Sequence, residues 1–465
     1  MATINSSPPS PIQSRIKRNI VLVHDQPKFD LESYLANYQG RTRVERLLFI
    51  GASSTVLGVE ALKLAIKEAK KGKDVNRYLQ AQNTLRVVGP FEPEASRDLP
   101  WVEKQGKINQ AETTRLEAEL KGYKNNLIKE SIRMGHEDLG KHYQAIGDLH
   151  KAFEAYTRMR QDISMAKQIV DVSKHLIEVS IEQRNYVAVA SNLQKIQGTL
   201  GSPDDDRSLQ PFLCTAQGLC HLDAADYYSA ARKFLSVEAG IGSSCSTFIS
   251  PNDVAVYGGL CALATMDRNE LQTKVLENSN FRTYLELEPH IRRAISSFVN
   301  GRYTACLEVL EAYRSDYLLD LHLQKHIDEL HQLVRTKSIV QYFVPFSCVT
   351  LESLDAAFAA PGKTIEKELV AMITKKELDA RIDTQNRLLT SLPSAPRSSL
   401  HNLALETAKE YERETRLRIQ HMNIQGADLE IKGNKRNVAF NSGLDNDFFD
   451  GGFGRGRDLR SGRNA

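Results

Sequence analysis

Apolar residues recur at intervals of three and four along most of the chain, which is the spacing of one face of an α-helix. In residues 28–80 one such face, with lysines opposite it, is formed by Val59, Leu62, Ala65, Ile66 and Ala69. Three prolines in residues 89–100 predict a long loop, and Trp101 begins a charged helix that is predicted to run to about Met134. We therefore expect an N-terminal helical region over residues 28–134.

A phrase of small and aromatic residues then recurs at the offsets of a tetratricopeptide unit. Its fullest copy comprises Leu139, Gly140, Tyr143, Gly147, Leu149, Ala152 and Tyr156. Partial copies follow at Tyr186, Val189 and Leu193, at Tyr227, Ala230 and Phe234, and at Gly301, Tyr303, Cys306 and Leu310. Such helix pairs cannot bury their apolar faces alone, so they stack into a solenoid. The pattern predicts a degenerate repeat array over residues 135–325.

The spacing of apolar residues along the chain changes after this array. A helix ending at Phe343, a short β-prone segment and two short helices precede Leu378–Asp383, whose alternation predicts a strand with one buried face. A turn leads to a second strand, Arg387–Thr390, expected to lie on the outside of the sheet. This order of elements is that of a winged helix, which we place at residues 326–392. Edge strands can pair with a neighbouring sheet, so the expected assembly face includes Leu378, Ile382, Arg387 and Leu389.

One further helix, placed at residues 400–431, carries a thin apolar stripe. Its sizeable members are Leu400, Tyr411, Ile419 and Met422. No apolar element remains in the chain to cover this stripe, so we expect the helix to join helices of other proteins. Residues 1–27 and the Gly/Arg-rich residues 432–465 have no helical period and are expected to be disordered.

Composition narrows the class of protein. The 465 residues include 61 Lys and Arg and 58 Asp and Glu, a net charge of +3 that is too small for a general polyanion binder. No apolar run is long enough for a transmembrane helix, and the first twenty residues lack the apolar core of a signal peptide. Six scattered cysteines without CxxC spacing predict free thiols in a reducing compartment, the nucleus or the cytoplasm.

Specific phrases resemble a known family. A winged helix that follows a helical repeat array is the architecture of PCI-domain proteins. The phrases that narrow the match are Asp30–Tyr34, Arg43–Leu47, Lys129–Gly140, Leu285–Pro289, Ile339–Phe343 and above all Val256–Thr265. They resemble the subunit-one family of the COP-9 signalosome, and the resemblance covers roughly residues 28–425. The expected fold class is therefore an all-α solenoid of TPR-like helical repeats followed by a winged-helix (PCI) subdomain and a C-terminal bundling helix, with the whole PCI module at about residues 225–392.

The resemblance implies a function in protein assembly. It implies a non-catalytic scaffold subunit of the complex that removes the ubiquitin-like modifier Nedd-eight from cullin-RING ubiquitin ligases. The implied partners are other PCI subunits, with subunits two and three as neighbours, and a separate zinc isopeptidase subunit. Cullin-RING ligases would be contacted only indirectly, and no membrane partner is expected.

Catalytic chemistry finds no support in the sequence. A zinc isopeptidase of this class needs a His-x-His pair, and none of the twelve histidines forms one. His322, His326 and His331 are the nearest cluster, and we interpret them as exposed polar helix positions. No phosphate-binding loop or Gly-x-Ser-x-Gly motif occurs. We expect no catalytic, cofactor-binding or metal-ligating residue, and no enzyme.

Two alternatives stay open. The first is a PCI subunit of the proteasome lid, which shares the architecture. The second is a nucleic-acid-binding winged helix with an RNA-binding Gly/Arg tail. The expected recognition segment carries Lys363, Lys367, Lys375 and Lys376, but intervening glutamates balance these charges. Groove binding requires several unbalanced phosphate contacts, so the sequence disfavours this second alternative.

Overall fold

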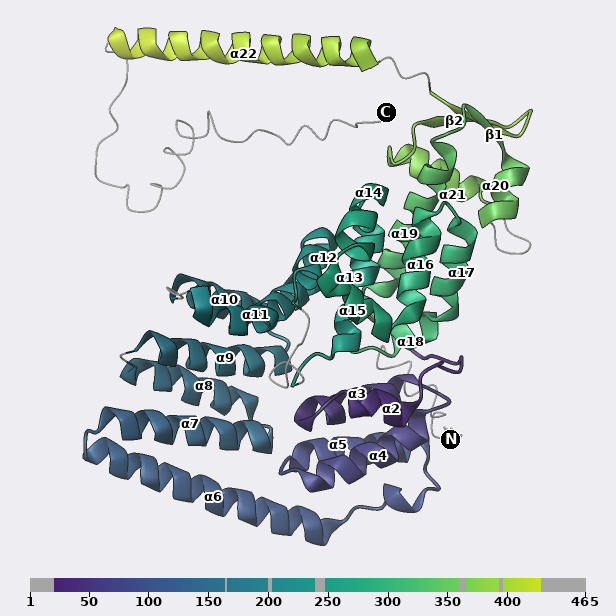
Figure 1. Cartoon of the computed structure of the whole chain (residues 1–465). Helices are drawn as coiled ribbons and strands as arrows, with labels where there is room; N and C mark the ends of the chain where they lie inside the picture. Colours follow the sequence, from purple (N-terminus) through teal and green to yellow (C-terminus); the bar gives the residue numbers. More distant parts are fainter. Residues whose placement is uncertain are drawn as a thin grey trace, which may run out of the picture. The chain divides into compact units, whose positions relative to one another are not determined.

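The computed structural model describes residues 21–163, 165–199, 203–238, 247–358, 364–392 and 396–427. The chain divides into two compact units, residues 1–391 and 392–465. The described part is helical apart from one small sheet in the first unit (Figure 1). The fold class predicted from the sequence, a helical repeat array with a winged helix, is confirmed.

The N-terminal helices form a group with its own apolar core. They are α2 (Leu31–Ala36), α3 (Gly40–Ser53), α4 (Gly58–Lys71) and α5 (Val75–Val88). Asp30 and Asp74 cap α2 and α5, because each carboxylate accepts a hydrogen bond from a backbone N–H of the first turn. The side chains of Leu47, Leu62 and Tyr78 are fully buried between these helices.

The predicted helix from Trp101 to Met134 is in fact two helices. After the short helix η1 (Pro93–Ala95), α6 spans Leu99–Asn125 and α7 spans Lys129–Ile146. Leu127 between them has a φ of 53°, a left-handed conformation that ends a helix. The boundary that we placed between residues 134 and 135 therefore falls inside α7.

The repeat helices pack as successive antiparallel neighbours. They are α7, α8 (Leu149–Met159), η2 (Arg160–Asp162), α9 (Ala166–Glu182), α10 (Tyr186–Thr199), α11 (Pro203–Asp223) and α12 (Tyr227–Leu235). The glycines of the repeated phrase lie where two helices cross. A Cβ on Gly140 would lie 2.6 Å from the Tyr156 ring, and a Cβ on Gly218 would lie 2.6 Å from the Phe234 ring. The phrase thus pairs a glycine on one helix with an aromatic ring on the next.

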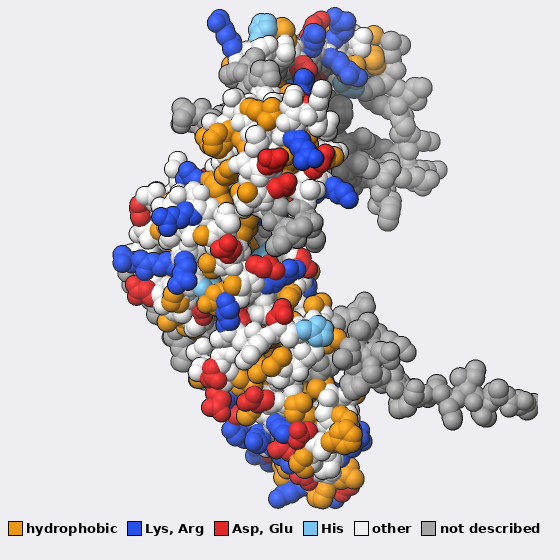
Figure 2. All heavy atoms as spheres, turned by 90° about the vertical axis from the view of Figure 1, so that its right-hand side faces the viewer, with side chains coloured by type: hydrophobic (Ala, Val, Ile, Leu, Met, Phe, Trp, Pro, Cys, Tyr) orange, Lys and Arg blue, Asp and Glu red, His pale blue; other side chains and the backbone are white. Residues whose placement is uncertain are grey.

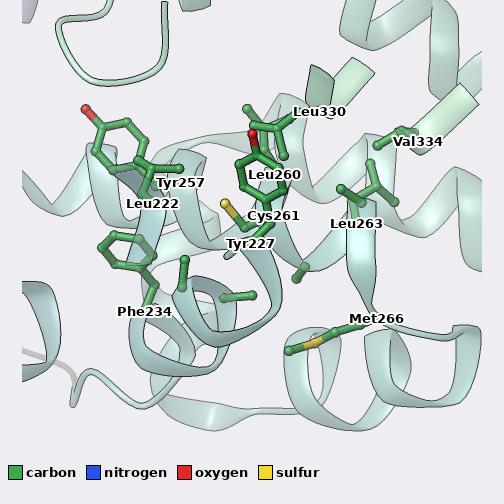
Figure 3. Close-up of a cluster of buried hydrophobic side chains, with 14 of the residues drawn as sticks. Leu222, Tyr227, Phe234, Tyr257, Leu260, Cys261, Leu263, Met266, Leu330 and Val334 are labelled. Atoms are coloured by element: carbon green, nitrogen blue, oxygen red, sulfur yellow. The ribbon is translucent and has the colours of Figure 1, made fainter. Parts of the chain in front are cut away.

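Helix α13 (Pro251–Thr265) is the centre of the largest core. It carries the Val256–Thr265 phrase and is buried on almost every side. Leu260, Cys261 and Leu263 lie in this core with Leu330 and Val334, which come from α19 (Ile327–Phe343) (Figure 3). Along the chain, the elements between α13 and α19 are α14 (Arg268–Glu270), η3 (Leu271–Leu276), α15 (Ser279–Leu287), α16 (Pro289–Val299), α17 (Tyr303–Ala312) and α18 (Arg314–Leu318).

The winged helix follows α19 directly. Its elements are β1 (Cys348–Thr350), α20 (Leu351–Phe358), α21 (Glu366–Thr374), β2 (Ala380–Asp383) and β3 (Leu388–Ser391). The three strands are antiparallel in the order β1–β3–β2. The prediction that the last strand lies on the outside of the sheet is therefore wrong. Strand β3 lies in the middle, because β1 pairs with the side of β3 that β2 leaves free.

The second unit contains helix α22 (Pro396–Gly426), which begins four residues before the predicted start. Expectations about residues 1–20 and 428–465 fall outside the described residues. Among the residues that are described, no helix is long and apolar enough to cross a membrane.

Candidate assembly surfaces

The winged-helix sheet has two open edges. Strand β3 pairs on both sides, whereas β1 and β2 each pair only with β3 in the described part of the chain. Their outer backbone groups can therefore accept a strand from a neighbouring sheet. Arg387 precedes β3 with a φ of 50°, and its carbonyl oxygen accepts a hydrogen bond from the Leu351 N–H. Arg387 thus belongs to the hairpin turn and not to an edge.

Two of the residues predicted for the assembly face lie inside the subdomain. Leu378 and Leu389 are buried in the core that β3 shares with α19, α20 and α21. Ile382 is half-buried against that core, and only Arg387 is exposed. Alternation along the strand predicted the burial correctly, but a buried side chain cannot also contact a partner. The side chains of Leu378 and Leu389 are therefore removed from the expected face.

Exposed apolar residues instead precede β1. Val344 and Phe346 are among the exposed large apolar side chains, and the Phe346 ring packs on Tyr342 at a centroid distance of 5.8 Å. The thiol-bearing residue Cys348, at the start of β1, is also exposed. Sequence reasoning missed this surface, although the run Val344-Pro345-Phe346 carried a signal: it is apolar and ends a helix. An open strand edge beside apolar side chains favours β1 as the pairing edge.

Helix α22 presents apolar side chains that nothing in the described part of its own unit covers. The predicted anchors are between 52% and 68% exposed: Leu400, Tyr411, Ile419 and Met422. The sequence analysis did not predict a second row of exposed apolar side chains on this helix. Its members are Leu403, Leu417 and Ile424, which follow one another at intervals of fourteen and seven residues. Leu403, three residues after Leu400, lies beside it on the helix surface, whereas Leu417 and Ile424, six and two residues after Tyr411 and Met422, lie on another side of the helix from those anchors. A helix with two apolar faces suits a bundle in which it has more than one neighbour.

A buried ionic cluster joins the N-terminal helices to the rest of the unit. The Arg46 guanidinium in α3 donates hydrogen bonds to Asp253 of α13 at 2.8 Å and to Asp320 after α18 at 2.7 Å. The hydroxyls of Tyr38 and Tyr257 donate to the same two carboxylates. Burial acts to raise the pKa of Asp320, but the charge of Arg46 and the hydrogen bond from Tyr257 outweigh it and lower that pKa. Asp253 also caps α13, so the cluster fixes the start of the central helix.

His326 is buried and His322 and His331 are only partly exposed, which corrects their interpretation as exposed helix positions. His322 and His326 precede α19 in a turn, where their Nδ1 atoms lie 3.2 Å from the hydroxyls of Tyr186 and Tyr227 respectively. Burial lowers the pKa of His322 to about 4, so its imidazole is neutral at physiological pH. Among the described residues, no group of histidines, cysteines and acids is arranged to hold a metal ion.

The cysteines in the described segments are free thiols, as predicted. Burial raises the pKa of Cys220, Cys261 and Cys306 to about 12. These thiols are therefore protonated and unreactive, and they act as small apolar core residues.

Charges of both signs are interspersed over the surface, as the face in Figure 2 shows. The expected recognition helix α21 begins with Glu366 and Glu368, and Glu368 is paired with Arg335 of α19 at 2.7 Å. This arrangement lacks the basic stripe on which nucleic-acid binding depends.

Comparison with known proteins defines the class. Two family models match the chain: "26S proteasome subunit RPN7" over residues 98–274 and "PCI domain" over residues 310–392. Together with the winged helix that follows the repeat array, these matches define a PCI-domain protein.

Similarity to whole proteins then identifies the family. The chain is 48% identical over 438 residues to COP9 signalosome complex subunit 1 of Emericella nidulans, covering 91% of this chain and 88% of that protein. It is 38% identical over 402 residues to the Arabidopsis thaliana protein of the same name, covering 85% and 89%. The Dictyostelium discoideum 26S proteasome non-ATPase regulatory subunit 6 is 23% identical over 360 residues, covering 75% and 93%. The chain belongs to the family of COP9 signalosome subunit 1.

Proposed function

We propose that this chain is a non-catalytic scaffold subunit of a COP-9 signalosome. The observation that carries the proposal is the 48% identity to a signalosome subunit over 91% of the chain. The open β1 edge and the uncovered apolar faces of α22 support it, because each is a surface suited to protein assembly. In this role the chain supports removal of Nedd-eight from cullin-RING ligases by holding other subunits in place.

The proposed partners follow from the two surfaces. Other PCI subunits, in the first place subunits two and three, would extend the winged-helix sheet at β1. Helices of several subunits, including the zinc isopeptidase, would pack on α22. The chain would act wherever the complex acts, in the nucleus and the cytoplasm, and would meet cullin-RING ligases only within the complex.

An activity assay tests the scaffold role. The purified chain is expected to leave a Nedd-eight-modified cullin intact, with or without added zinc. Cells that lack the chain should accumulate modified cullins, because the separate isopeptidase needs the assembled complex. Turnover by the isolated chain that survives removal of trace partner subunits would refute the proposal.

The proteasome lid is the second candidate, favoured by the match of residues 98–274 to the "26S proteasome subunit RPN7" model. Its support is weaker, because the identity to the Dictyostelium discoideum proteasomal subunit is 23%, about half the 48% identity to the Emericella nidulans signalosome subunit. Identification of co-purifying proteins separates the two, because the complexes contain different neighbours.

A further inference from the structure

A groove in the first unit lies between α6, α7 and α8, which pack side by side in the order of the chain (Figure 1). Its volume is about 460 Å³, and each of the three helices contributes three or four of the residues that line it. None of these residues belongs to the winged helix or to the Arg46 cluster. The groove is therefore a surface that the proposed scaffold role does not yet account for.

Apolar side chains form the floor of the groove. They belong to Leu120, Leu139, Tyr143 and Ala155, each of which is between 4% and 9% exposed. The Tyr143 hydroxyl donates a hydrogen bond to the Glu117 carboxylate at 2.8 Å, which fixes the ring in the floor. An apolar side chain of a ligand that covered this floor would remove apolar surface from water on both molecules.

Cationic side chains predominate at the rim. Four of the lining residues are lysine or arginine and two are glutamate. On α8, Arg158 is paired with Glu154 at 3.4 Å, and Lys151 is paired at 2.9 Å with the carboxylate that caps the helix. On α6, Lys121 and Lys124 are exposed, and neither forms an ion pair with a described residue. The rim therefore offers two lysines of α6 whose charges have no partner among the described residues.

These two lysines lie on one face of α6, because residues three apart are neighbours on a helix surface. A hollow with apolar walls and charges of one sign concentrates ligands of the opposite sign. Carboxylates of a ligand could therefore contact Lys121 and Lys124 together, while its apolar part lies on the floor.

Exposed apolar residues continue this surface beyond α6. Leu127 and Ile128 are 81% and 54% exposed, and the Leu127 N–H donates a hydrogen bond to the Lys124 carbonyl oxygen at 3.2 Å. Leu127 thus lies directly beside the end of the groove. Apolar side chains next to lysines favour a peptide ligand over a nucleic acid, because phosphates would gain nothing from Leu127 and Ile128.

We propose that this groove binds a short acidic segment of a partner protein, which places one large apolar side chain on the floor. The aspartate or glutamate side chains of the segment lie at Lys121 and Lys124, and a further apolar residue covers Leu127. The inference adds a partner chemistry to the proposed scaffold role and does not depend on the complex that the chain joins.

Binding of short labelled peptides to the full chain, followed by fluorescence anisotropy, tests the inference. The probe is acetyl-Ser-Asp-Asp-Phe-Asp-Gly. One comparison peptide has asparagine in place of each aspartate, and another has alanine in place of phenylalanine. We expect saturable binding of the probe, binding about tenfold weaker for the alanine peptide and none for the asparagine peptide. This assay needs no complex, so the inference and the proposed scaffold role can each fail without the other.

Matched variants locate the site. The double variant Lys121→Gln, Lys124→Gln removes the two unpaired charges and should weaken binding of the probe by about tenfold or more. The control Lys104→Gln, Lys107→Gln removes the same charge from exposed positions of the same spacing on the same helix, outside the groove. It should leave the affinity unchanged. All four lysines are exposed, so both variants should retain the wild-type melting temperature within a few degrees.

Any of four results would overturn the inference. Two are the absence of saturable binding of the probe and equal affinity in the groove variant and its control. A third is a labelled oligouridine that binds more tightly than the probe and loses its binding in the groove variant, because the ligand would then be a nucleic acid. The fourth is a chain truncated after Ile431 that binds the probe more tightly than the full chain by tenfold or more. The occupant would then be this chain's own acidic segment Asp445–Phe453 and not a partner.

Discussion

Arg46 and Asp320 are separated by 274 residues in sequence, yet their side chains are joined by a buried hydrogen bond of 2.7 Å. The same guanidinium bonds Asp253, so one cation connects α3, α13 and the turn before α19. A buried cation of this kind is tolerated because two carboxylates and the hydroxyls of Tyr34 and Tyr257 accept hydrogen bonds from its two terminal nitrogens. The N-terminal helices are thereby placed against the central helix of the unit.

Replacement of Arg46 tests this connection. Arg46→Met leaves two carboxylates buried without a cation, and we expect it to lower the free energy of unfolding by about 3–5 kcal/mol. The control is Arg43→Met, three residues earlier in the same helix, where the partly exposed Arg43 faces Glu68 at 3.7 Å. That change should cost less than about 1 kcal/mol. If urea denaturation showed that Arg46→Met and Arg43→Met lower the free energy of unfolding equally, the buried cluster would have no special role in stability.

A glycine pair in α13 gives a prediction about packing. A Cβ on Gly259 would overlap the branched side chain of Ile291 in α16, which cannot rotate away easily. We expect Gly259→Ala to destabilise the protein by about 1–3 kcal/mol. Gly106→Ala in α6 meets nothing within 4 Å and should stabilise it by about 0.5–1 kcal/mol, since alanine favours a helix. Thermal denaturation of both variants measures the difference, and a stabilising Gly259→Ala would contradict the packing.

The pH dependence of stability should report on Glu182. Burial raises the pKa of Glu182 to about 7, although Arg41 lies 3.4 Å away and opposes the shift. The folded state therefore holds a proton that the unfolded chain releases near the ordinary pKa of glutamate. Stability is lost through this group as the pH rises from about 4.5 to 7, and the loss is complete above 7.

The Glu182→Gln variant removes the ionisation of this buried carboxyl, and with it the loss of stability at high pH. Between pH 5 and pH 8 its free energy of unfolding should rise relative to wild type, by up to about 3 kcal/mol. Glu178→Gln, one turn earlier and more exposed, is the control and should show little of this pH dependence. Parallel urea denaturation curves of wild type and Glu182→Gln at all pH values would refute the assignment.

The accessibility of Cys348 tests the β1 edge. In the free chain this exposed thiol should react readily with iodoacetamide, whereas the buried cysteines should not. If β1 pairs with a neighbouring sheet, assembly into the complex should slow the alkylation of Cys348 by at least about tenfold, as measured by mass spectrometry of the modified peptides. Unchanged reactivity in the complex would leave β2 as the pairing edge.

Local sequence patterns predicted most of the elements but not the contacts between distant ones. Helix periodicity located α4 and the repeat helices, and alternation located the buried face of β2. The pairing of β1 with β3 was missed, because strand order depends on contacts between segments some forty residues apart. The break at Leu127 was missed as well, since leucine rarely adopts a left-handed conformation. The Arg46 cluster left only one trace in the sequence, the phrase Arg43–Leu47, which does not show its distant partners.

Affinity purification of the chain, tagged and expressed at its native level, tests the central claim most directly. Wild type is compared with the variant Tyr411→Ala, Ile419→Ala, which removes two exposed anchors of α22, and with a truncation after Ile431. Wild type and the truncated chain should recover signalosome subunits. The double variant should lose them while it keeps its melting temperature, because burial of each anchor contributes roughly 1.5–3 kcal/mol to association. Recovery of proteasome-lid subunits or nucleic acid by wild type, or an intact complex with the double variant and a lost one with the truncation, would contradict the account.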